Sequence, residues 1–384
     1  MEIYLDNSAT TRTFPAVRET MVRTMAEDFG NPSSLHRKGV EAERYVRQAQ
    51  EQIARSLKVD PKEILFTSGG TESNNLAILG TAMAASRIGR HLVTSSVEHP
   101  SVSEAMKYLE EQGYSVTWLP VDSQGRVSPE AVEAAVTPET ILVSIMAVNN
   151  EIGTREPVEE MGPRIKARNP RCLFHVDAVQ GFGKYRLRPR AAKIDLLSVS
   201  AHKIHGPKGI GFLYVRDGVR LHPILFGGGQ QHGLRSGTEN VPGIAGLGAA
   251  VEEIYRDHEA RMDRLYACKA RLTQGLRKLP DVRVNGPEGR EGAPHIVSAS
   301  FAGVRSEVLL HALEEKGIYV SAGSACSSHH PGVSSTLAAI GLDKKWLEST
   351  LRFSMSMDTT EEEIDTVLQA LEGLLPFLRR FTRR

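Results

Sequence analysis

A lysine and an aspartate each follow a short apolar run. Polar residues ending in Lys203 follow the run at 196–199, and Asp177 directly follows the run at 173–176. A lysine acts as a nucleophile when burial or nearby cations destabilise its ammonium. A buried carboxylate requires a partner. A surface Lys203 and a turn-capping Asp177 are the plain alternatives, whereas the chemical interpretation makes Asp177 the anion that holds a proton on a ligand's ring nitrogen.

The sequence SGGT at residues 68–71 joins a strand-length run to a helical one. Glycines let the backbone approach a ligand, and exposed N–H groups beside the Thr71 hydroxyl suit a phosphate. The segment lacks the Gly-Lys-Ser/Thr end of a nucleotide phosphate loop, so ATP or GTP use is disfavoured. Taken alone, it fits an ordinary turn between strand and helix equally well.

His99 follows a further strand-length run and precedes Pro100. A histidine here is more often structural when nothing accompanies it. A lysine, an acid, a helix start for a phosphate and a flat ring are together the groups that pyridoxal phosphate needs. We therefore predict that cofactor.

The segment 320–335 consists mostly of small or polar residues, is rich in serine, and contains Cys326. Such a segment is expected to be exposed and mobile, so Cys326 is not a core cysteine. Cys172 and Cys268 lie inside a strand pattern and a helix pattern and are expected to be buried. No spaced partner accompanies the neighbouring histidines, so no metal site is predicted. Arg352 stands between apolar residues, where its fork suits a substrate carboxylate or a surface ion pair.

Strands that alternate with helices must position these residues. A helical pattern at about 70–85 follows the strand predicted at 63–67, and another at 101–112 follows the strand predicted at 91–97. Parallel strands need covering connections, so the alternation predicts an α/β fold with a mostly parallel sheet of the seven-stranded type. In such sheets, ligands bind where loops leave the carboxyl ends of the strands. The predicted strands are 63–67, 91–97, 115–121, 141–148, 173–176, 196–199 and 210–215.

The pattern changes after about residue 250. Residues 251–279 form one long, charged, amphipathic helix pattern, and 296–301 and 318–320 resemble strands of a smaller α+β unit. Thr360 and Glu363 predict a capping box that opens a last helix. The apolar face of that helix carries Ile364, Val367, Leu368 and Leu371. The domains expected are an N-terminal arm at 1–14, a large cofactor-binding domain at 15–250 and a small domain at 251–384 that carries the Cys326 loop.

The composition excludes several classes of function. The chain has 384 residues, with 47 Lys and Arg against 46 Asp and Glu, so its net charge of +1 provides no strong field for nucleic acid or an acidic membrane. No apolar run approaches the roughly 20 residues of a membrane span, and no secretory signal is visible. Three widely spaced cysteines suit a reducing compartment, so a cytoplasmic protein is expected. The basic end 379–384 suggests RNA binding, but it is typical of a solvated helix end.

With these residues in view, the sequence closely resembles the NifS/IscS-type cysteine desulfurases. These belong to the class V aminotransferase family of fold-type I pyridoxal-phosphate enzymes. The resemblance runs nearly end to end, and as an ordered set its motifs are highly specific. The motifs are YLDNSATT at 4–11, GNPSS at 30–34, TSGGTESNN at 67–75, VNNEIG at 148–153, HVDAVQ at 175–180, HK at 202–203, RSGT at 235–238 and GSAC at 323–326.

The resemblance implies which residues hold the cofactor. Lys203 would bind it covalently, and Asp177 would pair with its ring nitrogen. His99 would stack on the ring and carry protons, and Gln180 would contact the phenolic oxygen. The implied phosphate contacts are Gly70, Thr71, Ser200 and His202, with Thr238 reaching in from a second subunit of a homodimer.

The resemblance also implies the reaction, which converts L-cysteine to L-alanine with a persulfide on Cys326. Asn150 and Arg352 would hold the substrate, with Arg235 as a second candidate for its carboxylate. The sulfur would pass to an iron–sulfur scaffold, a tRNA-thiolation enzyme or a cofactor pathway. The loop after Cys326 differs from that of the bacterial housekeeping members, and the chain ends at Arg384 without their scaffold-binding extension, so the acceptor stays open.

Other functions are weighed against this one. A selenocysteine lyase or a transaminase could use the same scaffold, although a transaminase has no use for a loop thiol. A non-catalytic sulfur carrier or scaffold subunit would have no need of Lys203, Asp177 and His99. Cysteine desulfurase activity is the function that we expect.

Overall fold

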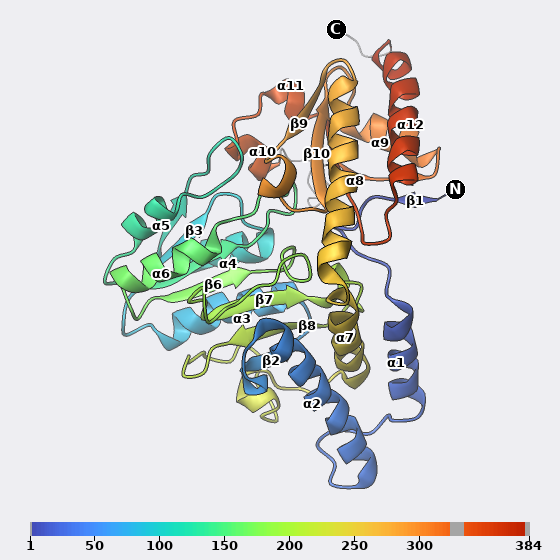
Figure 1. The fold of residues 1–384 in the computed structure, drawn as a ribbon. Helices are drawn as coiled ribbons and strands as arrows, with labels where there is room; N and C mark the ends of the chain where they lie inside the picture. The colour runs from blue at the N-terminus through green and yellow to red at the C-terminus, as the bar shows by residue number, and fades with distance from the viewer. Residues whose placement is uncertain (1, 323–333, 381–384) are drawn as a thin grey trace.

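A sheet of seven strands forms the centre of the larger part of the fold. The computed structural model describes residues 2–322 and 334–380 (Figure 1). All the strands predicted for this sheet are confirmed, with ends that shift by a residue or two. In spatial order they are β2 (Ile64–Thr67), β8 (Gly211–Val215), β7 (Leu196–Ser200), β6 (Leu173–Asp177), β5 (Thr140–Met146), β3 (His91–Ser95) and β4 (Ser115–Leu119).

The sheet is mostly parallel, as the alternation of strands and helices predicted. Strands β4, β3, β5, β6 and β7 run parallel, and only β8 runs antiparallel to its two neighbours. Both faces are covered, because Leu213 of β8 packs in one apolar cluster while Phe212 and Tyr214 pack in another. This two-sided burial explains why the strands read as continuous apolar runs.

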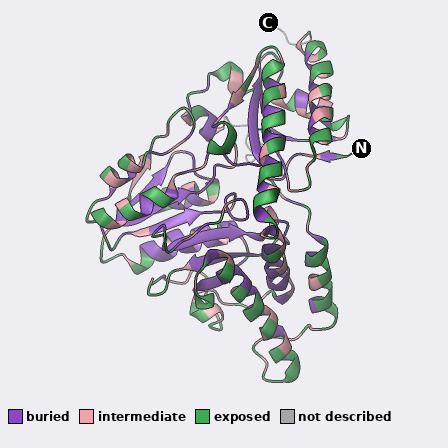
Figure 2. Ribbon diagram, viewed as in Figure 1, coloured by how far each residue is buried: buried purple, intermediate pink, exposed green. Residues whose placement is uncertain are grey.

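Helices cover both faces of this sheet. The cluster that contains Leu213 includes residues of α3 (Gly70–Ala84) and α4 (Pro100–Glu111). The opposite cluster draws on the remaining helices of this part of the chain. These are α1 (Pro15–Ala26), α2 (Arg37–Leu57), α5 (Pro129–Ala135), α6 (Val158–Arg168) and α7 (Val241–Ile254). Figure 2 shows most strands of the sheet as buried and the outer faces of the helices as exposed.

A second sheet of four antiparallel strands has its own core. Its order is β12 (Ser321–Ala322), β13 (Thr350–Ser354), β10 (Ile296–Phe301) and β9 (Val282–Asn285). Figure 1 shows α8 and α12 side by side against this sheet. The helices of this part are α8 (His258–Lys278), α9 (Ser306–Glu314), α10 (Ser335–Ala339), α11 (Lys344–Leu347) and α12 (Glu361–Arg379). Strand β10 has the limits that the sequence predicted.

The predicted capping box at the start of α12 is confirmed. The Thr360 hydroxyl accepts the backbone N–H of Glu363, and the Glu363 carboxylate accepts the backbone N–H of Thr360. The apolar face of the helix packs into the second core, where Ile364, Val367 and Leu371 are buried.

The single long helix predicted over 251–279 is wrong. The chain breaks between α7 and α8, where Asp257 takes a left-handed conformation with φ of 47°. Tyr255 fixes the break, because its hydroxyl accepts the backbone N–H of Gly183 and donates to the carbonyl of Tyr185. The buried residues change from the first core to the second between Ile254 and Met262. The domain limits given from the sequence stay a prediction.

The N-terminal segment connects the two sheets. Strand β1 (Ile3–Tyr4) pairs in parallel with β11 (Ile318–Tyr319), which confirms the strand predicted at 318–320. Leu5 packs in the second core and Phe14 in the first. Between them, the backbone N–H of Asn7 bonds to the carbonyl of Ser354, and that of Thr11 bonds to the carbonyl of His202. The segment therefore passes directly over the edge of the large sheet where β7 ends.

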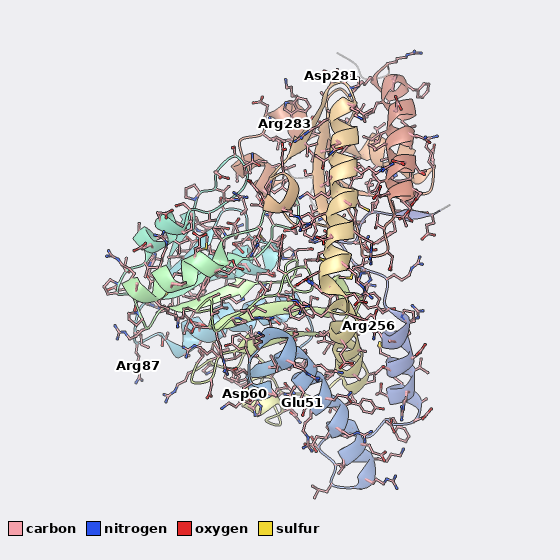
Figure 3. The ribbon with its side chains drawn as sticks, in the orientation of Figure 1. Glu51, Asp60, Arg87, Arg256, Asp281 and Arg283 are labelled. Carbon is pink, nitrogen blue, oxygen red and sulfur yellow. The ribbon has the colours of Figure 1, made fainter. Side chains whose placement is uncertain are left out.

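Most charged side chains lie on the outside of the fold. Figure 3 labels three of them, Arg87, Arg256 and Arg283, and all three are exposed. Within residues 2–322 and 334–380, no helix is both long and apolar enough to cross a bilayer.

Candidate active site

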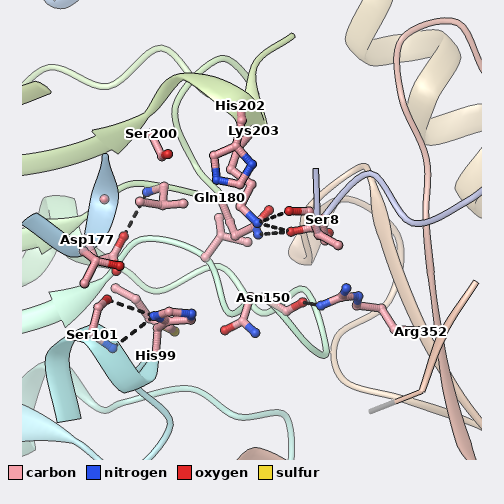
Figure 4. A pocket seen from close by; sticks show the side chains of 16 residues that line it. Ser8, His99, Ser101, Asn150, Asp177, Gln180, Ser200, His202, Lys203 and Arg352 are labelled. Atoms are coloured by element: carbon pink, nitrogen blue, oxygen red, sulfur yellow. Dashed lines mark hydrogen bonds between the residues drawn. The ribbon is translucent and has the colours of Figure 1, made fainter. Parts of the chain in front are cut away.

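A cavity of about 320 Å³ opens at the carboxyl ends of the parallel strands (Figure 4). This is the edge of the sheet at which ligands bind in open α/β folds. Elements from both sheets and the N-terminal segment line it, so the whole chain must fold before it exists. The lining residues are Ser8, Ala9, Gly70, Thr71, His99, Ser101, Met146, Val148, Asn150, Asp177, Val179, Gln180, Ser200, His202, Lys203 and Arg352.

Asp177 ends β6 at the bottom of this cavity and is only 5% exposed. Its Oδ1 accepts the backbone N–H of Val179 at 2.9 Å, and its Oδ2 accepts Nδ2 of Asn74 at 2.7 Å. The two donors hold the carboxylate in one orientation, as an anion facing a cationic group in the cavity requires.

A directed chain of hydrogen bonds runs from Asn74 to His99. Asn74 Nδ2 also donates to Ser101 Oγ at 2.8 Å, so the Ser101 hydroxyl is left to donate to His99 Nδ1, 2.8 Å away. The backbone N–H of Ser101 donates to the same Nδ1. Because Nδ1 accepts, the proton of the neutral ring sits on Nε2. Burial lowers the pKa of His99, and Lys203 adds to this effect while Asp177 opposes it.

Lys203 lies directly after β7, at the end of the short 3-10 helix Ala201–Lys203. Its Nζ donates to the carbonyls of Ser8 at 2.5 Å and Ala9 at 2.7 Å. Burial, with added repulsion from Lys203 and Lys208, lowers the pKa of the neighbouring His202 to about 4. A neutral His202 beside Lys203 adds no positive charge to the cavity at neutral pH.

The start of α3 forms one wall of the cavity. Gly69 precedes it with φ of 150° and ψ of −172°, a conformation open essentially to glycine alone. No side chain caps the helix, and a Cβ on Gly70 would lie 2.7 Å from Cγ2 of Val179. The N-terminus of this 15-residue helix therefore presents backbone N–H groups to the cavity, beside Thr71 and Ser200. Such an end binds anions, and phosphate in particular.

Arg352 of β13 enters the cavity from the second sheet. One guanidinium nitrogen donates to the carbonyl of Asn150 at 2.9 Å, and the other pairs with Oδ1 of Asp6 at 2.9 Å. The arginine is 5% exposed, and its buried Nε finds no hydrogen-bond partner among the described residues. A buried arginine with donors to spare is suited to hold a carboxylate.

The cavity does not include every residue that the sequence singled out. Arg235 pairs instead with Glu72, Nε to Oε1 at 2.9 Å, and does not line the cavity. Thr238 is exposed on the same segment and does not line it either. Cys326 lies outside the described residues. Cys172 and Cys268 are buried as expected, and burial raises the pKa of both thiols, that of Cys172 to about 12.

Sequence reasoning missed several residues that shape the site. Asp6, Ser8 and Asn74 lie inside the quoted motifs, so a closer use of those motifs could have assigned them. His295 bonds to Gln180 from the loop before β10 and carried no signal in the sequence. Among the residues that the structure describes, no group of three or more metal-ligating side chains occurs.

The donor set of the cavity fits pyridoxal phosphate. It offers Lys203 for the aldehyde, Asp177 for the ring nitrogen, the start of α3 for the phosphate and His99 as a flat ring. The buried Ser8 hydroxyl, which has no hydrogen-bond partner within the described residues, also lines it. An unpartnered buried hydroxyl is costly, so a polar ligand is expected to complete this site.

Comparisons with known proteins agree with this assignment. The family model described as aminotransferase class-V matches residues 3–367. A protein named cysteine desulfurase IscS from Clostridium botulinum is 42% identical over 97% of this chain and 94% of its own length. A protein named cysteine desulfurase from a Nostoc species is 45% identical over 98% of this chain and 94% of its own length.

Solved structures give the same picture. A NifS-like protein superposes with a TM-score of 0.93 at 40% identity, covering 98% of this chain and all of its own. A structure titled SspA in complex with cysteine gives a TM-score of 0.81 at 36% identity, covering 92% of this chain and 99% of its own.

Proposed function

The chain belongs to the class-V aminotransferase family, and we propose that it uses the cavity for the pyridoxal-phosphate-dependent desulfuration of L-cysteine. The products are L-alanine and a persulfide, whose sulfur passes to an acceptor protein. The observation that carries the proposal is one cavity of about 320 Å³ that brings Lys203, Asp177 and His99 together with Arg352. Relatives named cysteine desulfurase over nearly the full chain support the substrate.

The residues around the cofactor have distinct roles. When bound, pyridoxal phosphate supplies an aldehyde that joins the substrate's amine and a ring that stores the electrons of the α-carbon. Asp177, oriented by Val179 and Asn74, keeps a proton on the ring nitrogen. The start of α3 holds the phosphate, with Thr71, Ser200 and His202 beside it.

Lys203 and Arg352 act on the substrate. Lys203 would be the base that removes the substrate's α-proton. The carbonyls of Ser8 and Ala9 accept hydrogen bonds from its ammonium, so they also fix the position of Nζ when it holds the proton. Arg352, held by Asp6 and Asn150, binds the substrate's carboxylate through its remaining N–H groups. Arg235 stays a second candidate for that carboxylate, although Glu72 already pairs with it.

We assign the nucleophile to Cys326. Its thiolate attacks the substrate's sulfur, a sulfur–sulfur bond forms, and the carbon–sulfur bond breaks with its electron pair left on carbon, which a proton then converts to alanine. The two described cysteines are unsuited to this step, because both are buried and their raised thiol pKa values keep them protonated.

The proposal includes a homodimer in the cytoplasm. Thr238 is exposed and away from its own chain's cavity, which fits a phosphate contact made to the partner's site. An iron–sulfur scaffold and a tRNA-thiolation enzyme are the candidate acceptors.

Mass spectrometry after a brief exposure to L-cysteine tests the proposal. One added sulfur is expected on the peptide that contains Cys326. Cys326→Ser should keep the cofactor's visible band and lose alanine production, while Cys172→Ser and Cys268→Ser should keep both. A persulfide on Cys172 or Cys268, or full activity in Cys326→Ser, would overturn the assignment. Faster turnover of selenocysteine, or amino transfer to a keto acid, would favour the lyase or the transaminase instead.

A further inference from the structure

Gln180 is held at both ends of its amide, and the polarity of both contacts is fixed. Its Nε2 donates to the backbone carbonyl of Ser8 at 3.0 Å. A carbonyl oxygen can only accept, so this contact decides which end of the amide is nitrogen. The oxygen, Oε1, therefore faces the other partner, Nε2 of His295, at 3.2 Å.

The same polarity fixes the tautomer of His295. Because Gln180 Oε1 can only accept, His295 Nε2 must carry the proton. His295 is 2% exposed, and its Nδ1 is buried with no hydrogen-bond partner among the described residues. Burial lowers the pKa of His295, with further lowering from Lys184, Lys269, Arg352 and Lys203. The ring is therefore neutral, and its bare Nδ1 lone pair lies in an electropositive surrounding.

We propose that His295 is a positioning residue that holds the amide of Gln180 with an N–H turned to the cofactor's phenolic oxygen. This inference rests on the cofactor contact proposed above for Gln180. The Nε2 of Gln180 has two hydrogens, and the carbonyl of Ser8 accepts one of them. The other is left for a ligand in the cavity, which Gln180 lines. His295 itself is not among the residues that line the cavity, so it acts through Gln180.

Removing the donor on His295 should disturb Gln180 in a defined way. Gln180 is 7% exposed, so an Oε1 without its donor would be a buried acceptor left unsatisfied. The Ser8 carbonyl still fixes the nitrogen end of the amide, but with its second anchor lost the amide can rotate away until Oε1 reaches another donor, and its remaining N–H then leaves the phenolic oxygen. Without this donor the phenolic oxygen would be more basic and would hold its shared proton to higher pH.

The test is the pH midpoint of the visible absorption band in the loaded protein without substrate. His295→Leu, which has no donor, should raise this midpoint by about one pH unit, the scale of one lost neutral hydrogen bond. His295→Gln is the matched control, because its side-chain amide can place an N–H near the position of the imidazole Nε2. It should restore the wild-type midpoint.

Gln180→Leu separates the two proposals. If Gln180 contacts the phenolic oxygen, Gln180→Leu shifts the midpoint upward, and the double variant with His295→Leu shows no more than this shift. An unshifted Gln180→Leu would overturn the proposed cofactor contact. A shifted Gln180→Leu beside an unshifted His295→Leu would overturn only the role of His295, and so would shifts that add in the double variant.

Comparing the melting of the cofactor-free proteins with the midpoint of the band in the loaded proteins distinguishes positioning from a general structural role. His295→Leu and His295→Gln both alter a buried side chain, so both can lower the melting temperature. Only His295→Leu should shift the midpoint of the band. Equal shifts in the two variants would show that the site responds to packing alone and would refute the inference.

Discussion

Asp177→Asn should separate the contribution of the Asp177 carboxylate to folding stability from its contribution to turnover. In the structure both oxygens of Asp177 accept hydrogen bonds, from Val179 at 2.9 Å and from Asn74 at 2.7 Å. An asparagine has one acceptor, so one of these donors would face an NH₂ group. A buried donor left unsatisfied costs about 1–3 kcal/mol. The cofactor-free variant should lose about that much free energy of unfolding, measured by denaturant titration.

The loss of turnover should be larger. Opposite charges about 4 Å apart attract by about 4 kcal/mol at an effective dielectric constant of about 20. An amide cannot supply this attraction to a protonated ring nitrogen, so kcat for alanine release should fall about a thousandfold. A fall of less than tenfold in fully loaded protein would refute the reasoning.

Asp195→Asn is the matched control. Asp195 is another buried carboxylate at 1% exposure, but it pairs with Lys166 and Arg216 and does not line the cavity. Breaking a buried ion pair costs about 3–5 kcal/mol, reduced here because Arg216 is 44% exposed. The folded Asp195→Asn protein should keep kcat within about twofold. Equal loss of turnover in both variants would mean that the effect of Asp177→Asn comes from weakened folding.

Three further substitutions test other parts of the site and the fold. Lys203→Ala should abolish both alanine production and the visible band, and normal alanine release would refute the role of Lys203. Arg352→Ala should raise KM at least tenfold with a smaller change in kcat, and an unchanged KM would move the carboxylate contact to another group such as Arg235. Glu156→Gln should flatten the loss of stability between about pH 4.5 and about pH 8. Burial raises the pKa of Glu156 from 4.5 to about 8, so its contribution is complete below about pH 4.5, falls by about 1.4 kcal/mol per pH unit above that, and is gone once the pH has risen through about 8. Equal slopes of unfolding free energy against pH in wild type and Glu156→Gln would contradict this.

The sequence predicted the large sheet well because its signal is local. Most of its strands are buried on both faces and appear as continuous apolar runs that need no knowledge of their neighbours, whereas the edge strand β4 is only partly buried. The break at Asp257 was missed because the amphipathic pattern continues through it. What ends α7 is a tertiary contact, in which the Tyr255 hydroxyl bonds to residues 183 and 185.

The sequence predicted the residues of the site that lie in recognisable motifs or strand patterns, but not the partners that orient them. Lys203, Asp177 and Arg352 lie in the cavity because strand ends or an apolar strand place them there. The partners that orient them come from distant parts of the chain, as Asp6 does for Arg352 across 346 residues. His295 could not be assigned, because its role depends on the direction of a hydrogen bond that only three-dimensional geometry reveals.

The N-terminal segment has a consequence for how the protein is made. The backbone N–H of Ser8 donates to the hydroxyl of Ser354, 346 residues away, and the carbonyl of Ser8 accepts a hydrogen bond from Nζ of Lys203. During synthesis, residues 2–14 must therefore wait for β13 to leave the ribosome before the cavity can close. Contacts of such long separation are slow to form, because the chain gains nothing from them until the loop is closed. Cofactor capture should then be one of the last events after translation, and a bulky fusion at the N-terminus should delay it more than one at the C-terminus.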